Sequence, residues 1–220
     1  LAVAGMAVTP ALPAWAENGI RQDSLGLERK EIKTGTCIKD VYTDKSMYSP
    51  NEPAALTVEI EPGKIMQGDS LYLRVRHLNT TVWEQEQPIR QGAGTEVFQI
   101  SLPGEDFKGY AVEVYWMRQK QVVDYRMTAI DVSSDWSRFP RYGYITKLDH
   151  RTDQEISDTL QRLKNHHING LFYYDVFDSQ EKPLAGTPDQ PDREWQSLAK
   201  QTVDAVSLKK TIDMGHSLHM

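Results

Sequence analysis

The sequence predicts two parts of different fold class, an all-β sandwich over residues 36–132 and an α/β segment over residues 133–220. Two observations predict this division. Apolar and polar residues alternate through the first part, as they do in strands with one buried face. The second part reads strand, helix, strand, helix, which is the order of parallel βα units. A length of 220 residues is enough for one or two domains of ordinary size.

The first 35 residues have the character of an export signal and a leader. Residues 1–16 carry no charge and end in Ala14-Trp15-Ala16, a small-x-small triplet of the kind that signal peptidase cleaves. We therefore predict that residues 1–16 are a signal peptide remnant and that the protein is secreted and extracellular. Residues 17–35 are polar and of mixed charge, which predicts a disordered leader.

Residues 36–132 read as a series of short strands. Turn signals such as Pro62-Gly63 and Pro103-Gly104 separate the alternating runs, and no helical periodicity interrupts them. This spacing is typical of an antiparallel, immunoglobulin-like sandwich. The alternation places the following residues on the inward faces of the strands: Leu56, Val58, Leu73, Val75, Val112, Val114 and Trp116.

The first βα unit follows a short connection over 133–141 that contains Pro140, so we expect the sandwich to brace the second part. A short strand is predicted over 142–146. Thr152 and Glu155 then have the spacing of a capping box, which predicts the start of a helix. Apolar residues recur on one face of this helix at Ile156, Leu160 and Leu163.

The second βα unit begins with the compact apolar run 168–174, which predicts a buried strand parallel to the first. A polar loop with several prolines follows. From about Asp192 the sequence is free of proline and predicts a second helix, weakened near its end by Gly215. Because two parallel strands cannot close a core, we expect the sequence to continue beyond Met220.

The composition argues against several functions. The 25 basic and 31 acidic residues give a formal net charge of −6 without a basic stripe, so we predict no nucleic-acid partner. A single cysteine permits neither an intrachain disulfide nor a cysteine-rich zinc site. No apolar run is long enough to span a membrane. A mildly acidic protein of this kind suits a neutral ligand.

Clusters of histidine and acidic residues have structural explanations. A zinc site needs three or four ligands with supporting carboxylates, and the closely spaced histidines form only two separate pairs, so we predict no metal site and no cofactor. The acidic groups are expected near helix N-termini, where the helix dipole favours negative charge. The histidine pairs are His166-His167 and His216/His219, and the acidic groups are Asp153/Glu155 and Asp189/Asp192/Glu194.

Two segments resemble glycoside hydrolase family 66. They are residues 131–144 (DVSSDWSRFPRYGY) and residues 167–175 (HINGLFYYD), the second followed by KPLAG at 182–186. This family comprises dextranases and cycloisomaltooligosaccharide glucanotransferases. The resemblance extends over about residues 38–220. It implies an immunoglobulin-like domain followed by a catalytic (β/α)8 barrel, of which residues 133–220 would form the first two βα units of an incomplete barrel.

The resemblance implies a retaining glycosidase acting on α-1,6-glucan (dextran) or isomaltooligosaccharides, with one carboxylate as nucleophile and another as acid. By the same resemblance both catalytic carboxylates lie beyond Met220, so we expect this chain alone to be inactive. Dextranase-type hydrolysis is the leading interpretation, and cyclodextran-forming transfer is the alternative within the family. A non-catalytic surface binding module is the alternative from another class.

Tyr174 and Asp175 are the candidate substrate-binding residues. They lie at the C-terminal end of the predicted strand 168–174, and in a barrel this end faces the active site. A pyranose offers an apolar face to an aromatic ring and hydroxyls to a carboxylate. The alternative is that Asp175 caps the following turn. We expect most of the other aromatic residues of the two strands to lie in the core: Tyr142, Tyr144, Phe172 and Tyr173.

Overall fold

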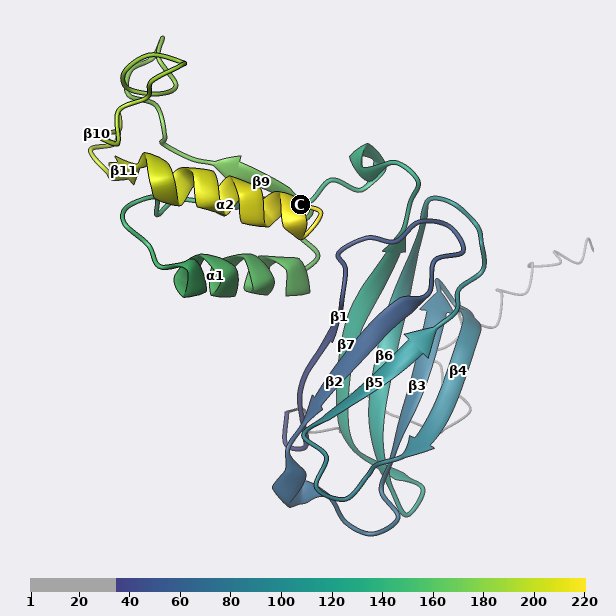
Figure 1. The fold of residues 1–220 in the computed structure, drawn as a ribbon. Coiled ribbons are helices and arrows are strands. Elements are labelled where there is room, and N and C mark those ends of the chain that lie inside the picture. The colour runs from purple at the N-terminus through teal and green to yellow at the C-terminus, as the bar shows by residue number, and fades with distance from the viewer. Residues whose placement is uncertain (1–34) are drawn as a thin grey trace, which may run out of the picture.

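The computed structural model describes residues 35–220. The predicted signal peptide remnant and all but the last residue of the predicted leader lie outside the described residues. Figure 1 shows a β-rich body and, beside it, a smaller body in which two helices lie against short strands. None of the helices within 35–220 is long and apolar enough to cross a membrane.

The β-rich body consists of two antiparallel sheets. The first has three strands in the order β1-β2-β5 and the second has four in the order β4-β3-β6-β7. The first sheet comprises β1 (Ile38–Thr43), β2 (Ala54–Ile60) and β5 (Thr95–Ile100). The second comprises β3 (Ser70–His77), β4 (Thr80–Pro88), β6 (Lys108–Arg118) and β7 (Gln121–Val132). The single helical turn among them is the 3-10 helix Pro62–Lys64.

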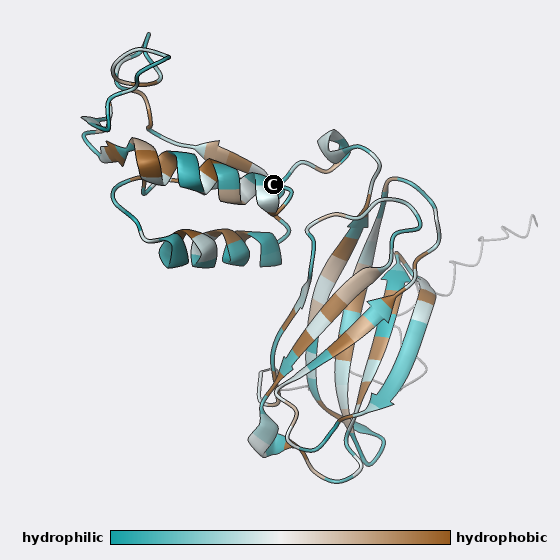
Figure 2. Cartoon of the chain, in the orientation of Figure 1, coloured by the Kyte–Doolittle hydropathy of each residue, from teal (hydrophilic) through white to brown (hydrophobic). Residues whose placement is uncertain are grey.

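Both sheets contribute to one hydrophobic core. All seven residues predicted to face inward have no exposed surface, which confirms the alternation inferred from the sequence. Figure 2 shows the same alternation as bands of hydrophobic and hydrophilic residues along the strands. The prediction of a mostly β-sheet fold is therefore confirmed, while its immunoglobulin-like type stays a prediction.

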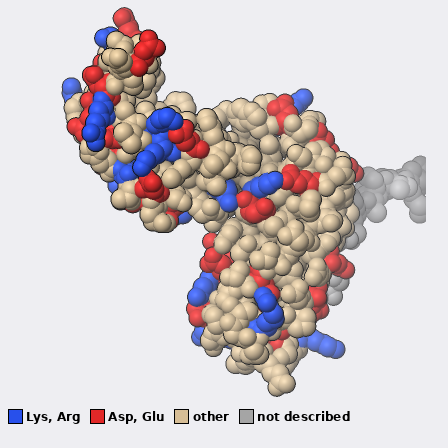
Figure 3. All heavy atoms as spheres, viewed as in Figure 1, with Lys and Arg blue, Asp and Glu red and all other residues tan. Residues whose placement is uncertain are grey.

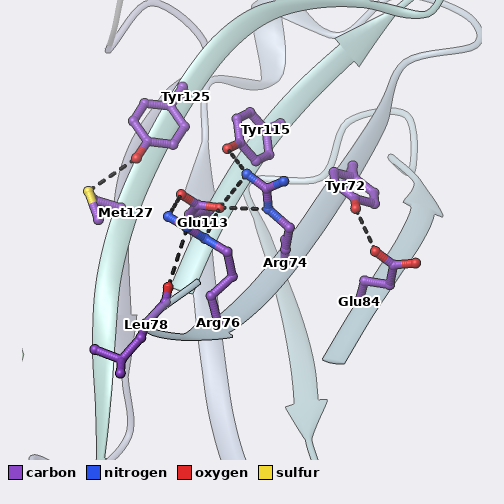
Figure 4. Close-up of polar contacts among 9 residues, drawn as sticks. All are labelled: Tyr72, Arg74, Arg76, Leu78, Glu84, Glu113, Tyr115, Tyr125 and Met127. Carbon is purple, nitrogen blue, oxygen red and sulfur yellow. Dashed lines mark hydrogen bonds and ion pairs between the residues drawn. The ribbon is translucent and has the colours of Figure 1, made fainter. Parts of the chain in front are cut away.

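A buried charge network lies on the face of the four-stranded sheet that points away from this core (Figure 4). Glu113 of β6 is fully buried and accepts charged hydrogen bonds from Arg74 and Arg76 of β3, at 2.7 Å and 2.8 Å. Arg74 also donates to the hydroxyl of Tyr115 at 3.0 Å. Two guanidinium groups thus compensate one buried carboxylate, because an unpaired charge there would be costly.

The first βα unit forms as predicted. β8 (Tyr142–Ile145) leads into α1 (Asp153–Asn165), and β9 (Gly170–Tyr173) returns parallel to β8. The Thr152 hydroxyl accepts from the Glu155 amide, and the Glu155 carboxylate accepts from the Thr152 amide, so the capping box is confirmed. Ile156 and Leu160 are buried on one face of the helix.

The second predicted helix begins later than the sequence indicates. Residues from about Asp192 form a short antiparallel hairpin of β10 (Glu194–Gln196) and β11 (Thr202–Asp204), and α2 starts only at Ala205 and ends at Ser217. The prediction of helix over 192–204 is therefore wrong. The physical reason is that Trp195 and Val203 pair across the hairpin and are both buried. Asp204 then caps α2 by accepting from the Ser207 amide at 2.7 Å.

Gly215 lies in the last turn of α2, two residues before the helix ends. A Cβ atom at this position would come within 2.7 Å of the Leu171 side chain of β9. The absence of a side chain therefore lets α2 pack directly on the strand. This close approach explains a glycine in a helix, where it costs roughly 1 kcal/mol relative to alanine.

The prediction that the run 168–174 forms a buried strand is wrong for one of its two faces. Gly143 and Ile145 are buried, and Leu171 and Tyr173 are partly buried, whereas Phe172 is 50% exposed. The helices α1 and α2 cover the same face of the β8–β9 pair, because Gly143 approaches Leu163 of α1 and Gly215 approaches Leu171. The opposite face is open, which explains the exposure.

Asn169 fixes the pairing of the two parallel strands at their N-terminal ends. Its side-chain oxygen accepts from the Arg141 amide at 2.8 Å, and its side-chain nitrogen donates to the Phe139 carbonyl at 3.0 Å. The backbone amides of Asn169 and Gly170 both donate to the Arg141 carbonyl. Asn169 is buried, so no solvent can replace these bonds.

Several contacts join the two bodies. Arg141 forms an ion pair with Asp131 at the end of β7. Lys164 of α1 donates to the Asp44 carbonyl at 2.9 Å. His167, which is buried, lies with its Nε2 atom 3.1 Å from the Thr128 hydroxyl of β7. Burial lowers the pKa of His167, although the charge of Asp131 acts in the opposite direction.

We expect Asn169→Ala to lower the free energy of unfolding by about 2–4 kcal/mol, because it leaves buried partners unsatisfied. Urea denaturation measures this loss. Asn165→Ala is the matched control, since the Asn165 side chain is only partly buried and accepts one hydrogen bond from Gln161. Equal and small losses in both variants would show that Asn169 does not fix the pairing of β8 and β9.

The lowered pKa of His167 predicts that stability falls as the pH falls. An unfolded histidine takes up a proton near pH 6.5, whereas folded His167 resists protonation until a lower pH. Below about pH 6.5 the unfolded state therefore binds more protons, and the free energy of unfolding decreases. Denaturation curves between about pH 7 and pH 5.5 should show a shallower decrease for His167→Gln. If the free energy of unfolding falls equally with pH in both proteins, His167 is not the cause of the decrease.

Candidate functional site

The open face of the parallel pair carries a cluster of aromatic side chains. Tyr144 of β8 packs against Phe172 of β9 with ring centroids 5.4 Å apart, and against Tyr174 at 6.1 Å, both edge-on. Tyr144 is 64% exposed, and Phe172 and Tyr174 are each 50% exposed. Tyr142 is also exposed, so the expectation that Tyr142, Tyr144 and Phe172 lie in the core is wrong.

The strand period explains this arrangement. Tyr144 and Phe172 are direct partners across the parallel pair, and Tyr142 and Tyr174 precede and follow them by two positions. Residues two apart in a strand point to the same face. Tyr173 points to the opposite face, where it packs on the core between the strands and the helices, as predicted.

Tyr174 and Asp175 form a turn directly after β9, which ends one residue earlier than the predicted strand 168–174. The Tyr174 amide donates to the Ile145 carbonyl at 3.0 Å, so its position is an extension of the parallel pairing. Asp175 has a positive φ of 57°, a left-handed conformation that aspartate tolerates better than most residues. Its side chain is half-buried and makes no hydrogen bond to another residue within 35–220, including the turn that it was expected to cap under the alternative.

A second polar group, which sequence reasoning missed, lies near the start of α2. His150, in the connection between β8 and α1, contacts Asp204 at 2.6 Å and Glu194 at 3.0 Å. Glu194 and Asp204 are direct partners across the β10–β11 hairpin, so His150 bridges two carboxylates that face each other. The spacing of Asp204 and Ser207, typical of a helix N-cap, was the available signal.

The environment of Asp204 favours its charged form. Burial acts to raise the pKa of Asp204, but the hydrogen bonds from Ser207 and the nearby His150 outweigh it and hold the pKa below its usual value. This group therefore serves as an anionic cap and hairpin anchor. Among the residues that the structure describes, no group of three or more His, Cys, Asp or Glu residues is arranged so that it could hold a metal ion.

The acidic groups predicted near helix N-termini divide into two cases. Asp153 and Glu155 lie in the first turn of α1, as expected. Asp189, Asp192 and Glu194 do not flank a helix, because the hairpin precedes α2. On the face of the molecule in Figure 3, basic and acidic side chains are intermingled rather than gathered into one large field.

An apolar groove of about 580 Å³ runs along α2, on the side of the helix that faces the loop before β10. The surface that lines it is almost entirely apolar. It is lined chiefly by Leu184, Pro191, Trp195, Val206, Leu208 and Ile212.

A family model described as glycosyl hydrolase family 66 matches residues 43–220. This match includes both helices, the parallel pair and nearly all of the two antiparallel sheets. The chain therefore belongs to glycosyl hydrolase family 66, as the motifs at 131–144 and 167–186 indicated.

Relatives of two kinds are similar to this chain. A cycloisomaltooligosaccharide glucanotransferase of Niallia circulans is 29% identical over 188 residues, which is 83% of this chain and 19% of that protein. A dextranase of Streptococcus salivarius is 25% identical over 141 residues, which is 58% of this chain and 17% of that protein. The chain thus spans about a fifth of the length of the relatives it matches.

A solved structure has the same fold over most of the chain. It is a cycloisomaltooligosaccharide glucanotransferase of Paenibacillus sp. complexed with cycloisomaltoheptaose. The two align with a TM-score of 0.68 and 29% identity over 83% of this chain and 26% of that one.

Proposed function

We propose that this chain is the N-terminal part of a secreted, retaining glycosidase that hydrolyses α-1,6-glucan in the manner of a dextranase. The observation that carries the proposal is the family match over 43–220, together with relatives named as dextranase and as cycloisomaltooligosaccharide glucanotransferase. The uncharged segment 1–16, with its small-x-small triplet, supports secretion.

The domain organisation that we propose follows the change of fold within the chain. Residues 36–132 form an immunoglobulin-like sandwich, and residues 133–220 form the first two βα units of a catalytic (β/α)8 barrel. The exposed aromatic face of the parallel pair and the apolar groove along α2 support this, because parallel sheets are normally covered on both faces. The catalytic carboxylates belong to later strands of the barrel.

In this proposal Tyr174 and Asp175 contact the glucan. The C-terminal ends of barrel strands carry the active site, and both residues directly follow β9 at that end. The exposed ring of Tyr174 suits the apolar face of a glucose unit, and the carboxylate of Asp175 can accept hydrogen bonds from its hydroxyls. These residues bind substrate and take no part in bond breaking.

Cyclodextran-forming transfer is the second candidate function. Two cycloisomaltooligosaccharide glucanotransferases match over 82–83% of this chain, against 58% for the dextranase, which favours this candidate on coverage. The two reactions share a glycosyl-enzyme and differ in what resolves it, water or the far end of the same glucan. The products distinguish them: linear isomaltooligosaccharides with new reducing ends in one case, cyclic ones without in the other.

We expect the full-length polypeptide that carries this sequence to release reducing ends from dextran, and residues 1–220 alone to release none above the buffer blank. A reducing-sugar assay combined with mass spectrometry of the products measures both. Cyclic products would favour the transferase. Activity of residues 1–220 alone would contradict the expectation that the catalytic carboxylates lie beyond Met220. A full-length protein that binds dextran but is inactive would favour a surface binding module.

We expect Asp175→Asn in the full-length enzyme to lower kcat/KM for dextran about ten-fold, equivalent to about 1.4 kcal/mol, with the fold unchanged. The amide keeps the shape of the side chain but weakens its acceptance of sugar hydroxyls. Asp158→Asn makes the same chemical change on the exposed surface of α1 and should leave the kinetics unchanged. Unchanged kinetics for Asp175→Asn in a folded enzyme would remove Asp175 from the substrate site.

A further inference from the structure

The turn that carries Asp175 is held at both of its ends. On the N-terminal side the Tyr174 amide donates to the Ile145 carbonyl at 3.0 Å. On the C-terminal side Val176 packs against the core between strands and helices. Between them Asp175 has a φ of 57°, a left-handed conformation that the contacts on either side help to hold.

The β10–β11 hairpin restrains the chain on the C-terminal side of Asp175. Trp195 of β10 is 6% exposed, and its indole N–H donates to the Val176 carbonyl at 2.7 Å. Three residues later, the Leu198 amide donates to the Phe177 carbonyl at 2.9 Å. Two hydrogen bonds therefore tie residues 195–198 to residues 176–177, the two positions that directly follow Asp175.

Trp195 is itself fixed before it makes this contact. Its strand partner is Val203, which is buried, and both belong to the core of the second body. The hairpin is closed further by His150, which contacts Glu194 and Asp204 on either side of it. An immobile donor of this kind restrains its acceptor at little further cost in conformational entropy.

We propose that Trp195 is a positioning residue for the substrate site. It does not touch the glucan. It acts through the Val176 carbonyl, which keeps the Asp175 carboxylate and the Tyr174 ring in the orientation that receives a glucose unit. This inference rests on the proposed function, because it assigns Trp195 a role only if Asp175 binds substrate.

The decisive variant is Trp195→Phe in the full-length enzyme, which keeps an aromatic ring and removes the N–H donor. The KM for dextran should rise roughly three- to ten-fold, with kcat changed by less than about two-fold. An interaction that is equally strong in the enzyme–substrate complex and in the transition state affects KM and leaves kcat unchanged. A change confined to kcat would overturn the inference.

Trp116→Phe is the matched control. Trp116 is a fully buried tryptophan of the β-rich body whose indole N–H donates to Asp69 at 2.9 Å. Both substitutions remove one indole hydrogen bond and should lower the melting temperature, but only Trp195→Phe should raise KM. An equal rise of KM in both variants would show that the effect of Trp195→Phe comes from a general loss of stability, and this would overturn the inference.

A surface substitution tests the same connection without altering the core. Leu198 is exposed and follows Ser197 at the second position of a turn closed by the Lys200 amide, where proline is well tolerated. Leu198→Pro removes the amide that bonds to Phe177 and should also raise KM. Leu198→Ala retains this amide, so an equal rise in both variants would assign the effect to the side chain and contradict the connection.

Combination with Asp175→Asn separates failure of this inference from failure of the proposed function. If Asp175→Asn leaves kcat/KM unchanged, the proposed substrate site is wrong and the role of Trp195 falls with it. If Asp175→Asn lowers kcat/KM but Trp195→Phe does not raise KM, only the positioning role is wrong. Because Trp195 acts in part through Asp175, the effects of Trp195→Phe and Asp175→Asn on kcat/KM should be less than additive. Full additivity would overturn the inference.

Discussion

The arrangement of the second body depends on the hydrogen bonds between Asn169 and the chain around Arg141. They set the register in which β9 pairs with β8, at the point where the chain leaves the β-rich body. Side chains alternate between the two faces of a strand, so a slip of one residue would exchange the faces. This register therefore decides that Leu171 meets α2 while Phe172 and Tyr144 lie on the open face.

The two bodies differ in how completely they bury their apolar residues. The two antiparallel sheets share a closed core in which Leu56, Val75 and Trp116 have no exposed surface. In the second body the helices cover one face of the parallel pair, and the aromatic side chains of the other face remain exposed. The β-rich body therefore buries its apolar residues more fully than the second body, which contacts it at Asp131 and Thr128.

The sequence predicted those features that depend on neighbours close in the chain. The alternating strands and the Thr152–Glu155 capping box are local signals, and both are present. The β10–β11 hairpin was missed because three-residue strands show no period, and because Trp195 gains its partners from Val203 and Val176. The run 168–174 is apolar on both faces, so it gave no sign that one face is open. Asp175 was placed correctly because a strand end is itself a local feature.

The connection between Trp195 and the Asp175 turn has a consequence for recognition of a neutral sugar. Each hydrogen bond to a hydroxyl contributes only about 1 kcal/mol net, so a flexible carboxylate would lose much of that gain on being ordered. In the proposed function Asp175 avoids this loss, because the pairing at Ile145 and the contact from Trp195 hold the backbone on both sides of it. The hydrogen bonds from Trp195 and Leu198 thus join the hairpin between 194 and 204 to the residues that follow the turn after β9.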